Sequence, residues 1–436
     1  MILVYSEHIT RRLKYITGVI FRDILKVPFG LTSSVEEISQ FDGPVVIYGK
    51  KDSELGVFIP ASELLFERKI HSVDPGYAGQ DGNDLLFYSN THEKNDIPFD
   101  LFSAAFYMVT RYEEYLPYRK DPLGRFPAEE SLAYQKGFLQ KAVVNRWALL
   151  LKEKISGRWP QYAFPDSGYR FISTIDIDAA WAYRQKGVFR TIGGLANDLL
   201  HPFSRDPLER LKVLAGLQRD PFDTYDFQQE IHARYHLRPF YFVLFGDYGP
   251  NDKNISYRNR KFRELIKSLA DRADIGIHPS FGSNNDPSRL REEVRRLSDL
   301  LHREVIRSRQ HFLMLQFPTT YRNLINLDIQ EDYTMGFASQ PGFRAGIATP
   351  YPFFDLDLDI ETNLKIFPFT YMEGTLKDYL NLTTAEATEM VKPLIREVKS
   401  VGGTFIPIWH NESLSETHRW KGWRTLYEEM IKEATT

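Results

Sequence analysis

Cysteine is missing from this sequence of 436 residues. Its absence excludes disulfide bonds, zinc sites built from thiolates and a cysteine nucleophile. A chain without cysteine fits a reducing compartment, although a periplasmic protein can also do without it. Catalysis and metal binding, if present, must therefore use other side chains.

The chain also lacks a strong net charge and long apolar runs. Its formal charge is −3, and we find no basic stripe interleaved with aromatic residues, so nucleic-acid binding is not expected. No apolar run reaches the length that a membrane span requires. Residues 1–8 have no basic region followed by a long apolar core, so no signal peptide is expected. These absences predict a cytoplasmic protein.

The length predicts two domains, because a single hydrophobic core rarely grows beyond about 300 residues. We expect a smaller α/β domain over residues 1–165, with no reaction centre of its own. A segment rich in turn formers, 157–168, marks the boundary. After it, strand and helix patterns alternate through residues 166–436, which is typical of βα units around a parallel sheet.

The apolar patterns place the individual elements. The strands expected in the first domain are 2–5, 44–48, 56–60 and 84–88, with helices at 11–25, 101–115 and 141–155. The strands expected in the second domain are 171–178, 238–246, 274–278, 309–315, 331–337, 365–372 and 404–410. Its expected helices are 223–236, 258–272, 286–304, 318–327 and 383–400. Residues 184–222 break this alternation, and we interpret them as a lid or cleft rim, or as a solvated surface excursion.

The run 171–180, FISTIDIDAA, reads as a buried strand that ends in Asp176 and Asp178. Catalytic groups of α/β barrels lie where such strands end. Residues two apart in an extended strand point the same way, so one carboxylate can bind a metal while the other acts as a base. An aspartate that caps the next helix would explain one of these carboxylates but not both.

Histidines stand at the ends of other expected strands. His278 and His410 follow two of them, and His311 lies near the start of 309–315. If these strands share a barrel, their carboxyl ends converge on one face. One histidine at a strand end is more often structural, but several beside two carboxylates favour zinc or a similar divalent ion.

This pattern resembles the polysaccharide deacetylase family, the NodB-homology domain of carbohydrate esterase family four, over roughly residues 170–415. The family's first motif is written TFDDG, and residues 174–178, TIDID, are similar to the D-x-D spelling of its peptidoglycan-deacetylase and allantoinase-like branch. The resemblance implies that Asp176 is a base and Asp178 a metal ligand. It also implies an α/β fold, a distorted (β/α)7-type deacetylase barrel with a smaller N-terminal α/β domain.

The second family motif, H-S/T-x-x-H, matches only in part. His278 stands at the first histidine and is implied as a ligand, but Gly282 stands at the second. This departure leaves the metal site one ligand short, and we suggest His311 as the replacement; packing under the site or touching substrate is its alternative role. The third motif centres on an arginine that orients the base, which Arg309 matches.

The last family motif is a strand that ends in L-x-H, and residues 408–410, IWH, fit it. The resemblance implies that His410 is the general acid. Trp409 is expected to line an acyl pocket. Glu373 is expected to hydrogen-bond His410 and raise its pKa, or else to face solvent at a helix start.

Arg344 lies in a loop between two glycines. It is a candidate for binding an anionic or carbonyl group of the substrate. Its alternative is an ion pair with a nearby carboxylate, for which Asp332 or Glu361 would serve.

Together these patterns predict a divalent-metal-dependent hydrolase, with zinc favoured, that removes acetyl groups from an N-acetylated sugar or glycan. Asp176 would accept a proton as water attacks, and His410 would give one to the leaving amine. The glycine at 282 leaves two alternatives open. One is a deacetylase-like carbohydrate-binding protein without turnover, and the other is a hydrolase of another non-peptide C–N bond.

Overall fold

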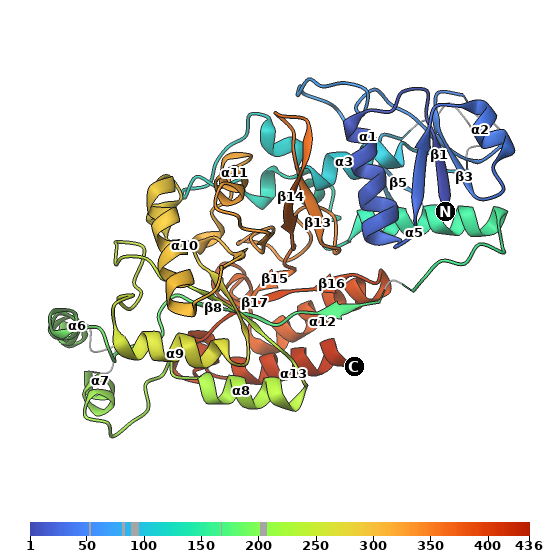
Figure 1. The fold of residues 1–436 in the computed structure, drawn as a ribbon. Coiled ribbons are helices and arrows are strands. Elements are labelled where there is room, and N and C mark those ends of the chain that lie inside the picture. Colours follow the sequence, from blue (N-terminus) through green and yellow to red (C-terminus); the bar gives the residue numbers. More distant parts are fainter. Residues whose placement is uncertain (52–53, 81–82, 89–95, 167, 201–206) are drawn as a thin grey trace.

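Two sets of parallel strands organise the chain, and helices pack around both (Figure 1). The structure is a computed structural model, and it describes residues 1–436 except 52–53, 81–82, 89–95, 167 and 201–206. The protein is a mixed α/β protein with parallel sheets, as the sequence predicts. Among the described helices, none is both long and apolar enough to cross a membrane.

The first sheet is built from short apolar segments near the N-terminus. Its strands are parallel in the order β2-β1-β3-β4, with β1 (Ile2–Tyr5), β2 (Phe29–Thr32), β3 (Val45–Gly49) and β4 (Val57–Pro60). Strands β1, β3 and β4 match the expectation, whereas β2 was not foreseen. A separate antiparallel hairpin contains β5 (Tyr77–Gln80) and β6 (Asn83–Leu86).

Polar caps fix where the helices of this part begin. Helix α1 (Arg11–Thr17) begins after Thr10, whose side chain accepts a hydrogen bond from the Leu13 amide, and it continues as a π-helix, Gly18–Ile24. Helix α3 (Leu101–Val109) is shorter than expected because Arg111 adopts a left-handed conformation with φ of 53°. The other helices are α2 (Val35–Gln40), α4 (Leu132–Gln135) and α5 (Val143–Arg158).

The second sheet has nine strands in the order β13-β14-β12-β11-β10-β9-β8-β17-β15. All neighbours are parallel except β13 and β14. The strands are β8 (Thr174–Ile177), β9 (Phe240–Val243), β10 (Asp274–Ile277), β11 (Arg307–Ser308), β12 (Glu331–Asp332), β13 (Tyr351–Asp355), β14 (Ile360–Ile366), β15 (Tyr371–Met372) and β17 (Pro407–His410). A short pair joins β7 (Arg170–Phe171) to β16 (Thr404–Phe405). Closure of this row into a barrel stays a prediction.

Helices connect the parallel strands, as a parallel arrangement requires. They are α8 (Tyr225–Arg234), α9 (Arg260–Ala270), α10 (Pro287–Leu301), α11 (Thr319–Ile325) and α12 (Thr384–Ser400), and a sixth helix, α13 (Trp423–Thr435), follows the last strand. Five of these six were predicted within a few residues. Helix α10 illustrates why these helices were predictable. Asp286 is its N-cap, Pro287 is its first residue, and one apolar stripe along it is buried.

Several expected strands are shorter than predicted. The segment 309–315 is wrong as a strand, because β11 ends at Ser308 and the chain turns at Phe312 and Leu313, which have φ of 57° and 53°. The segment 331–337 is a strand only over its first two residues. The antiparallel hairpin of β13 and β14 was not foreseen.

The two sheets are held together by buried polar contacts. Arg344 pairs with Glu114 (Nη2 to Oε2, 2.5 Å), and Arg12 pairs with Asp359 (Nε to Oδ1, 3.1 Å). The Tyr15 hydroxyl donates to the Pro352 carbonyl at 2.8 Å. A division into domains near residue 165 stays a prediction.

The segment 184–222 forms two helices, α6 (Val188–Leu200) and α7 (Pro207–Leu214). Figure 1 shows both at the end of the molecule farthest from the N-terminal sheet.

Candidate active site and metal centre

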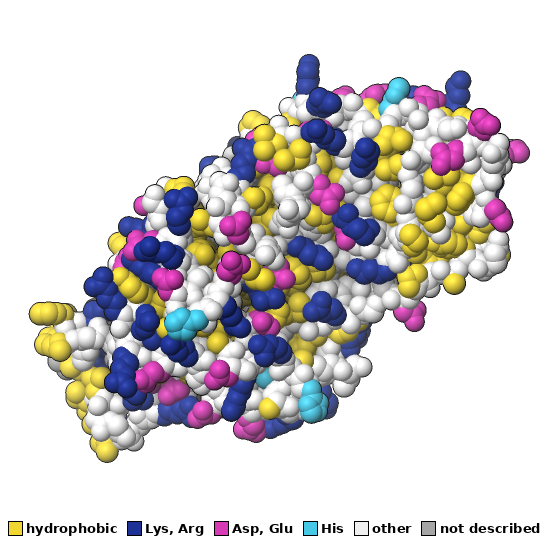
Figure 2. Space-filling view, viewed as in Figure 1, with side chains coloured by type: hydrophobic (Ala, Val, Ile, Leu, Met, Phe, Trp, Pro, Cys, Tyr) yellow, Lys and Arg dark blue, Asp and Glu magenta, His cyan; other side chains and the backbone are white. Residues whose placement is uncertain are grey.

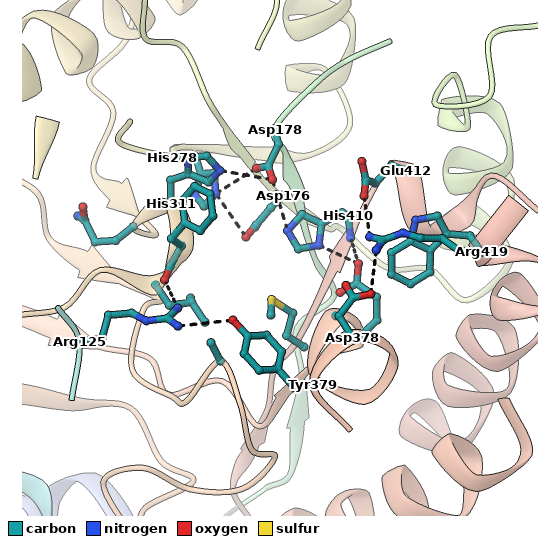
Figure 3. Close-up of a pocket in the computed structure, with 18 residues that line it drawn as sticks. Arg125, Asp176, Asp178, His278, His311, Asp378, Tyr379, His410, Glu412 and Arg419 are labelled. Carbon is teal, nitrogen blue, oxygen red and sulfur yellow. Dashed lines mark hydrogen bonds and ion pairs between the residues drawn. The ribbon is translucent and has the colours of Figure 1, made fainter. Parts of the chain in front are cut away.

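Strand register places the chemically competent side chains at one edge of the second sheet. Ile177 of β8 pairs with Val243 of β9, which pairs with Ile277 of β10. The residues that follow β8 and β10 are Asp178 and His278, so both lie at the same carboxyl edge. These two residues line one pocket with Asp176, His311, His410 and Glu373 (Figure 3).

Asp178, His278 and His311 form a cluster that could hold a metal ion. One oxygen or nitrogen atom of each lies within 4.8 Å of the others. The Nε2 atom of His278 is 3.2 Å from Asp178 Oδ1, and Nε2 of His311 is 3.6 Å from Oδ2. Two imidazoles and a carboxylate are a common donor set for a divalent transition ion.

The outer ring nitrogens of both histidines are held in place. Nδ1 of His278 donates to the Arg309 carbonyl at 2.5 Å, and Nδ1 of His311 lies 2.9 Å from Asp252 Oδ1. A neutral imidazole that donates through Nδ1 presents Nε2 as an acceptor. In that form Nε2 of His278 would face the buried Asp178 Oδ1 at 3.2 Å as a second acceptor. Two acceptor atoms facing each other are well placed for a cation, so the residues present fit a metal ion.

The electrostatics of the cluster favour this interpretation. Burial raises the pKa of Asp178, but His311, His278 and His410 outweigh it and hold that pKa well below the usual value. Burial lowers the pKa of His311, while Asp178 and Asp252 raise it to about 9. The ion-free cluster therefore holds a carboxylate against a cationic imidazole, and a divalent ion would replace that proton.

Asp176 is held by a fully buried arginine. Nη1 of Arg309 donates to Asp176 Oδ1 at 2.7 Å and to Thr174 Oγ1 at 2.9 Å. Nε of Arg309 donates to the Tyr333 carbonyl, and the guanidinium lies 4.4 Å from the centre of the Phe242 ring. These contacts fix the direction of the Asp176 carboxylate in the pocket.

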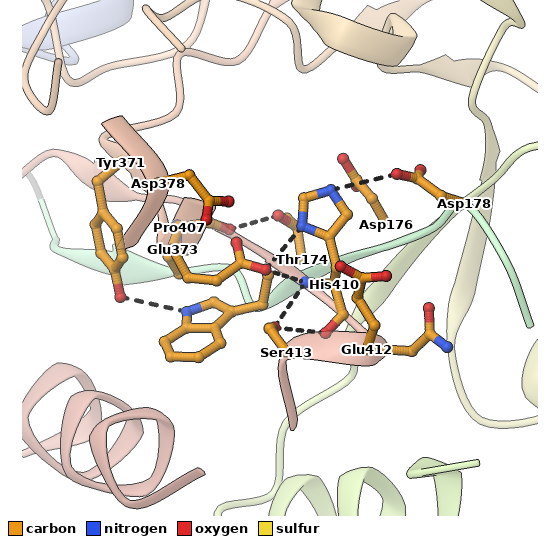
Figure 4. A network of polar contacts seen from close by, with 12 residues as sticks. Thr174, Asp176, Asp178, Tyr371, Glu373, Asp378, Pro407, His410, Glu412 and Ser413 are labelled. Carbon is orange, nitrogen blue, oxygen red and sulfur yellow. Dashed lines mark hydrogen bonds and ion pairs between the residues drawn. The ribbon is translucent and has the colours of Figure 1, made fainter. Parts of the chain in front are cut away.

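His410 is paired with the buried Glu373, as the sequence predicts (Figure 4). Oε1 of Glu373 lies 2.7 Å from Nδ1 of His410 and accepts a hydrogen bond from its backbone amide at 2.8 Å. Burial lowers the pKa of His410, but Glu373, Asp178 and Asp176 raise it well above its usual value. Its Nε2 lies 3.8 Å from Asp178 Oδ2, so the ring faces the metal cluster.

The structure places two predicted site residues elsewhere. Arg344 is 2% exposed, and its guanidinium is taken up by Glu114 and by the Gly336 carbonyl. Trp409 is fully buried, because alternate residues of β17 face opposite sides, and it donates to the Tyr371 hydroxyl at 3.3 Å. Neither side chain lines the pocket with His278. The expectation of an acyl pocket at Trp409 and a substrate contact at Arg344 differs from this arrangement.

Other pocket residues were not foreseen. Gln310 is 2% exposed, and its Nε2 atom makes no hydrogen bond. Its position in the sequence between Arg309 and His311 is a signal from which it could have been predicted as a site residue. The rings of Phe312 and Tyr379 line the rim and are 38% and 49% exposed. Asp252 comes from the loop after β9, and no local pattern links it to His311.

Comparisons with known proteins find one family model and several solved structures. Residues 2–160 match the model of a family of unknown function, DUF7033. A search of curated proteins finds no significant match. A solved structure from Mycobacterium smegmatis, classed as a polysaccharide deacetylase, is 16% identical and is matched over 63% of this chain and 87% of its own, with a TM-score of 0.42.

Two further solved structures are similar. The Puue allantoinase is 10% identical over 63% of this chain and 86% of its own, with a TM-score of 0.40. A Pseudomonas aeruginosa PAO1 protein, also classed as a polysaccharide deacetylase, is 11% identical over 61% of this chain and 84% of its own, with a TM-score of 0.38. The chain is therefore structurally similar to polysaccharide deacetylases and an allantoinase over about 63% of its length.

Proposed function

We propose that this protein is a divalent-metal-dependent hydrolase that removes acetyl groups from an N-acetylated sugar or glycan. The observation that carries the proposal is the cluster of Asp178, His278 and His311, whose potential ligand atoms lie within 4.8 Å of one another beside two further acid–base groups. In this proposal residues 166–436 form a distorted (β/α)7-type barrel, and residues 1–165 form a separate α/β domain.

The three clustered residues would hold the ion, and histidine with carboxylate ligands favours zinc. When bound, a divalent ion polarises the acetyl carbonyl and lowers the pKa of water. His311 supplies the ligand that Gly282 cannot. Asp252 supports it from behind, as carboxylates commonly do for histidine ligands.

Asp176 and His410 would carry the proton transfers. Asp176 accepts a proton from the attacking water, and Arg309 keeps its carboxylate directed into the pocket. His410, kept protonated by Glu373, donates to the leaving amine. Each such group typically contributes a factor of roughly 100 to 10,000 in rate.

The pocket rim supports a glycan as substrate. The exposed rings of Phe312 and Tyr379 offer flat apolar faces, against which a sugar ring can pack. Gln310 lines the same pocket, and its buried Nε2 atom has no hydrogen-bond partner. A hydrolase of another small amide would need the same ion but not these rings.

Zinc titration of the metal-free protein, followed by calorimetry, tests the centre. We expect one tight site in the parent and its loss in His311→Ala and His278→Ala. Asp252→Asn should bind roughly 10- to 100-fold more weakly, because it supports His311 without touching the ion. His71→Ala, at an exposed histidine outside the pocket, is the matched control.

Acetate release from N-acetylated chitooligosaccharides tests the reaction separately. The zinc-loaded parent should release acetate, and Asp176→Asn should keep zinc but lose turnover. Parental zinc affinity in His311→Ala would refute the ligand set. Tight zinc binding without acetate release would refute the deacetylase assignment alone.

A further inference from the structure

Helices α6 and α7 expose an unusual number of large apolar side chains. We define the α6–α7 patch as Val188, Phe189, Ile192, Leu200, Leu208, Leu211, Leu214 and Leu217. Phe189 is 92% exposed and Leu217 81%. Figure 2 shows hydrophobic side chains gathered over these helices at the lower left. Contiguous exposed apolar surface of this kind marks a binding site for a protein or a membrane.

The acidic groups in the described part of this segment, Asp198, Glu209 and Asp220, face inward. Asp198 pairs with Arg210 at 2.5 Å. Glu209 accepts from the Tyr183 hydroxyl at 2.8 Å, and Asp220 accepts backbone N–H groups of residues 182–184. Each of these three carboxylates belongs to a residue that is at least nine-tenths buried. The described carboxylates of this segment therefore add little negative charge to its surface.

Exposed cations belong to the segment or lie near the start of α6. Arg184 and Lys212 belong to the same segment and are exposed. Arg190 donates to the Lys253 carbonyl at 2.9 Å, which places the exposed Lys253 beside the start of α6. The contact between Asn259 and Gln185 brings the N-terminus of α9, with the exposed Arg258, to the same place. Exposed apolar side chains with cations beside them complement an anionic lipid surface.

The shape of the patch favours lipid over protein. Helices α6 and α7 form a projecting end of the molecule (Figure 1). Phe189, at the start of α6, is 92% exposed. A protein partner would need hollows that match each of these side chains. The interface of a bilayer accepts protruding apolar groups without such a match.

We propose that the α6–α7 patch docks this protein on an anionic lipid surface. Its apolar side chains enter the boundary between headgroups and acyl chains, and Arg184, Lys212 and Lys253 lie at headgroup level. No step of the proposed hydrolysis uses the patch, so either proposal can fail without the other.

Co-sedimentation with vesicles tests the docking. The full chain is mixed with vesicles of phosphatidylcholine alone, or of phosphatidylcholine with phosphatidylserine. We expect binding to the anionic vesicles, weaker binding to the neutral ones, and release at high salt. The double variant Phe189→Ser/Leu217→Ser should bind more than about tenfold more weakly, since each side chain buries a large apolar area. Val35→Ser, at an apolar side chain of 56% exposure in α2, is the matched control.

Three results would overturn the proposal. The first is a parent that sediments with neither kind of vesicle, and the second is a double variant that binds as well as the parent. The third is a dimer, seen by sedimentation velocity without lipid, that the double variant abolishes; a second copy of the chain would then cover the patch. Circular dichroism of the double variant excludes loss of folding as the cause of weak binding.

Discussion

Replacing Glu114 by glutamine should destabilise the protein more than replacing Arg344 by methionine. The Glu114 side chain is 1% exposed, and its carboxylate accepts from both Arg344 and Arg111. Glu114→Gln removes the carboxylate that Arg344 pairs with and leaves Arg111 with Glu113 alone. Arg344→Met leaves Glu114 paired with Arg111. Breaking a buried ion pair costs about 3–5 kcal/mol, so we expect about 3 kcal/mol for Arg344→Met and about 5 for Glu114→Gln.

Urea denaturation followed by circular dichroism measures these differences. The double variant Glu114→Gln/Arg344→Met should lose less free energy of unfolding than the two single losses added together, because the partners share one contact. Arg260→Met is the matched control, since Arg260 is 89% exposed and pairs with Glu264 on the surface of α9. It should change the stability by no more than about 0.5 kcal/mol.

The same experiment decides between two roles for Arg344. If Arg344→Met keeps the stability of the parent and raises KM for a glycan substrate, the side chain binds substrate as the sequence suggested. The reasoning from the buried pair would then be refuted. Additive losses in the double variant would also contradict it.

Two further predictions concern buried histidines. Glu373→Gln should lower kcat by about a hundredfold at neutral pH. Because the variant also lowers the pKa of His410, its activity should begin to fall at a lower pH than that of the parent as the pH rises. An unchanged pH–rate profile would contradict this. Burial lowers the pKa of His232 to about 3, from about 6.5 in the unfolded chain. The unfolded state therefore binds more protons below pH 6.5, and stability should fall by about 2 kcal/mol from pH 7 to pH 5. His232→Gln should lose this part of the pH dependence of the urea midpoint, and equal midpoint shifts in parent and variant would exclude the effect.

The elements with strong local patterns were predictable from sequence. Helix α10 has a cap, a proline at its start and a single apolar stripe, and β8 and β10 are short apolar runs that end in polar residues. Because parallel strands end at a common edge, the approach of Asp178 to His278 follows from these runs. His311 also lies at this edge of the sheet. The segment expected to be its strand is instead a turn, in which Phe312 has a φ of 57°.

The contacts that were missed join residues far apart in the chain. Arg344 and Glu114 form an ion pair although they are 230 residues apart in the sequence, and Asp252 and His311, which are in contact, are 59 residues apart. Only the packed structure decides which of many carboxylates a buried arginine reaches. Trp409 was misplaced for a different reason: a two-residue period says that neighbours face opposite sides, but not which side is the pocket.

Asp252 gives the metal cluster a single anchor point. It accepts hydrogen bonds from the amides of Phe281 and Gly282, just after His278, and it also contacts the ring of His311. The backbone carbonyls of the next two residues, Lys253 and Asn254, accept hydrogen bonds from the guanidinium of Arg190 at the start of α6. Residues 252–254 thus connect the start of α6 to two of the three candidate ligands through one short stretch of backbone.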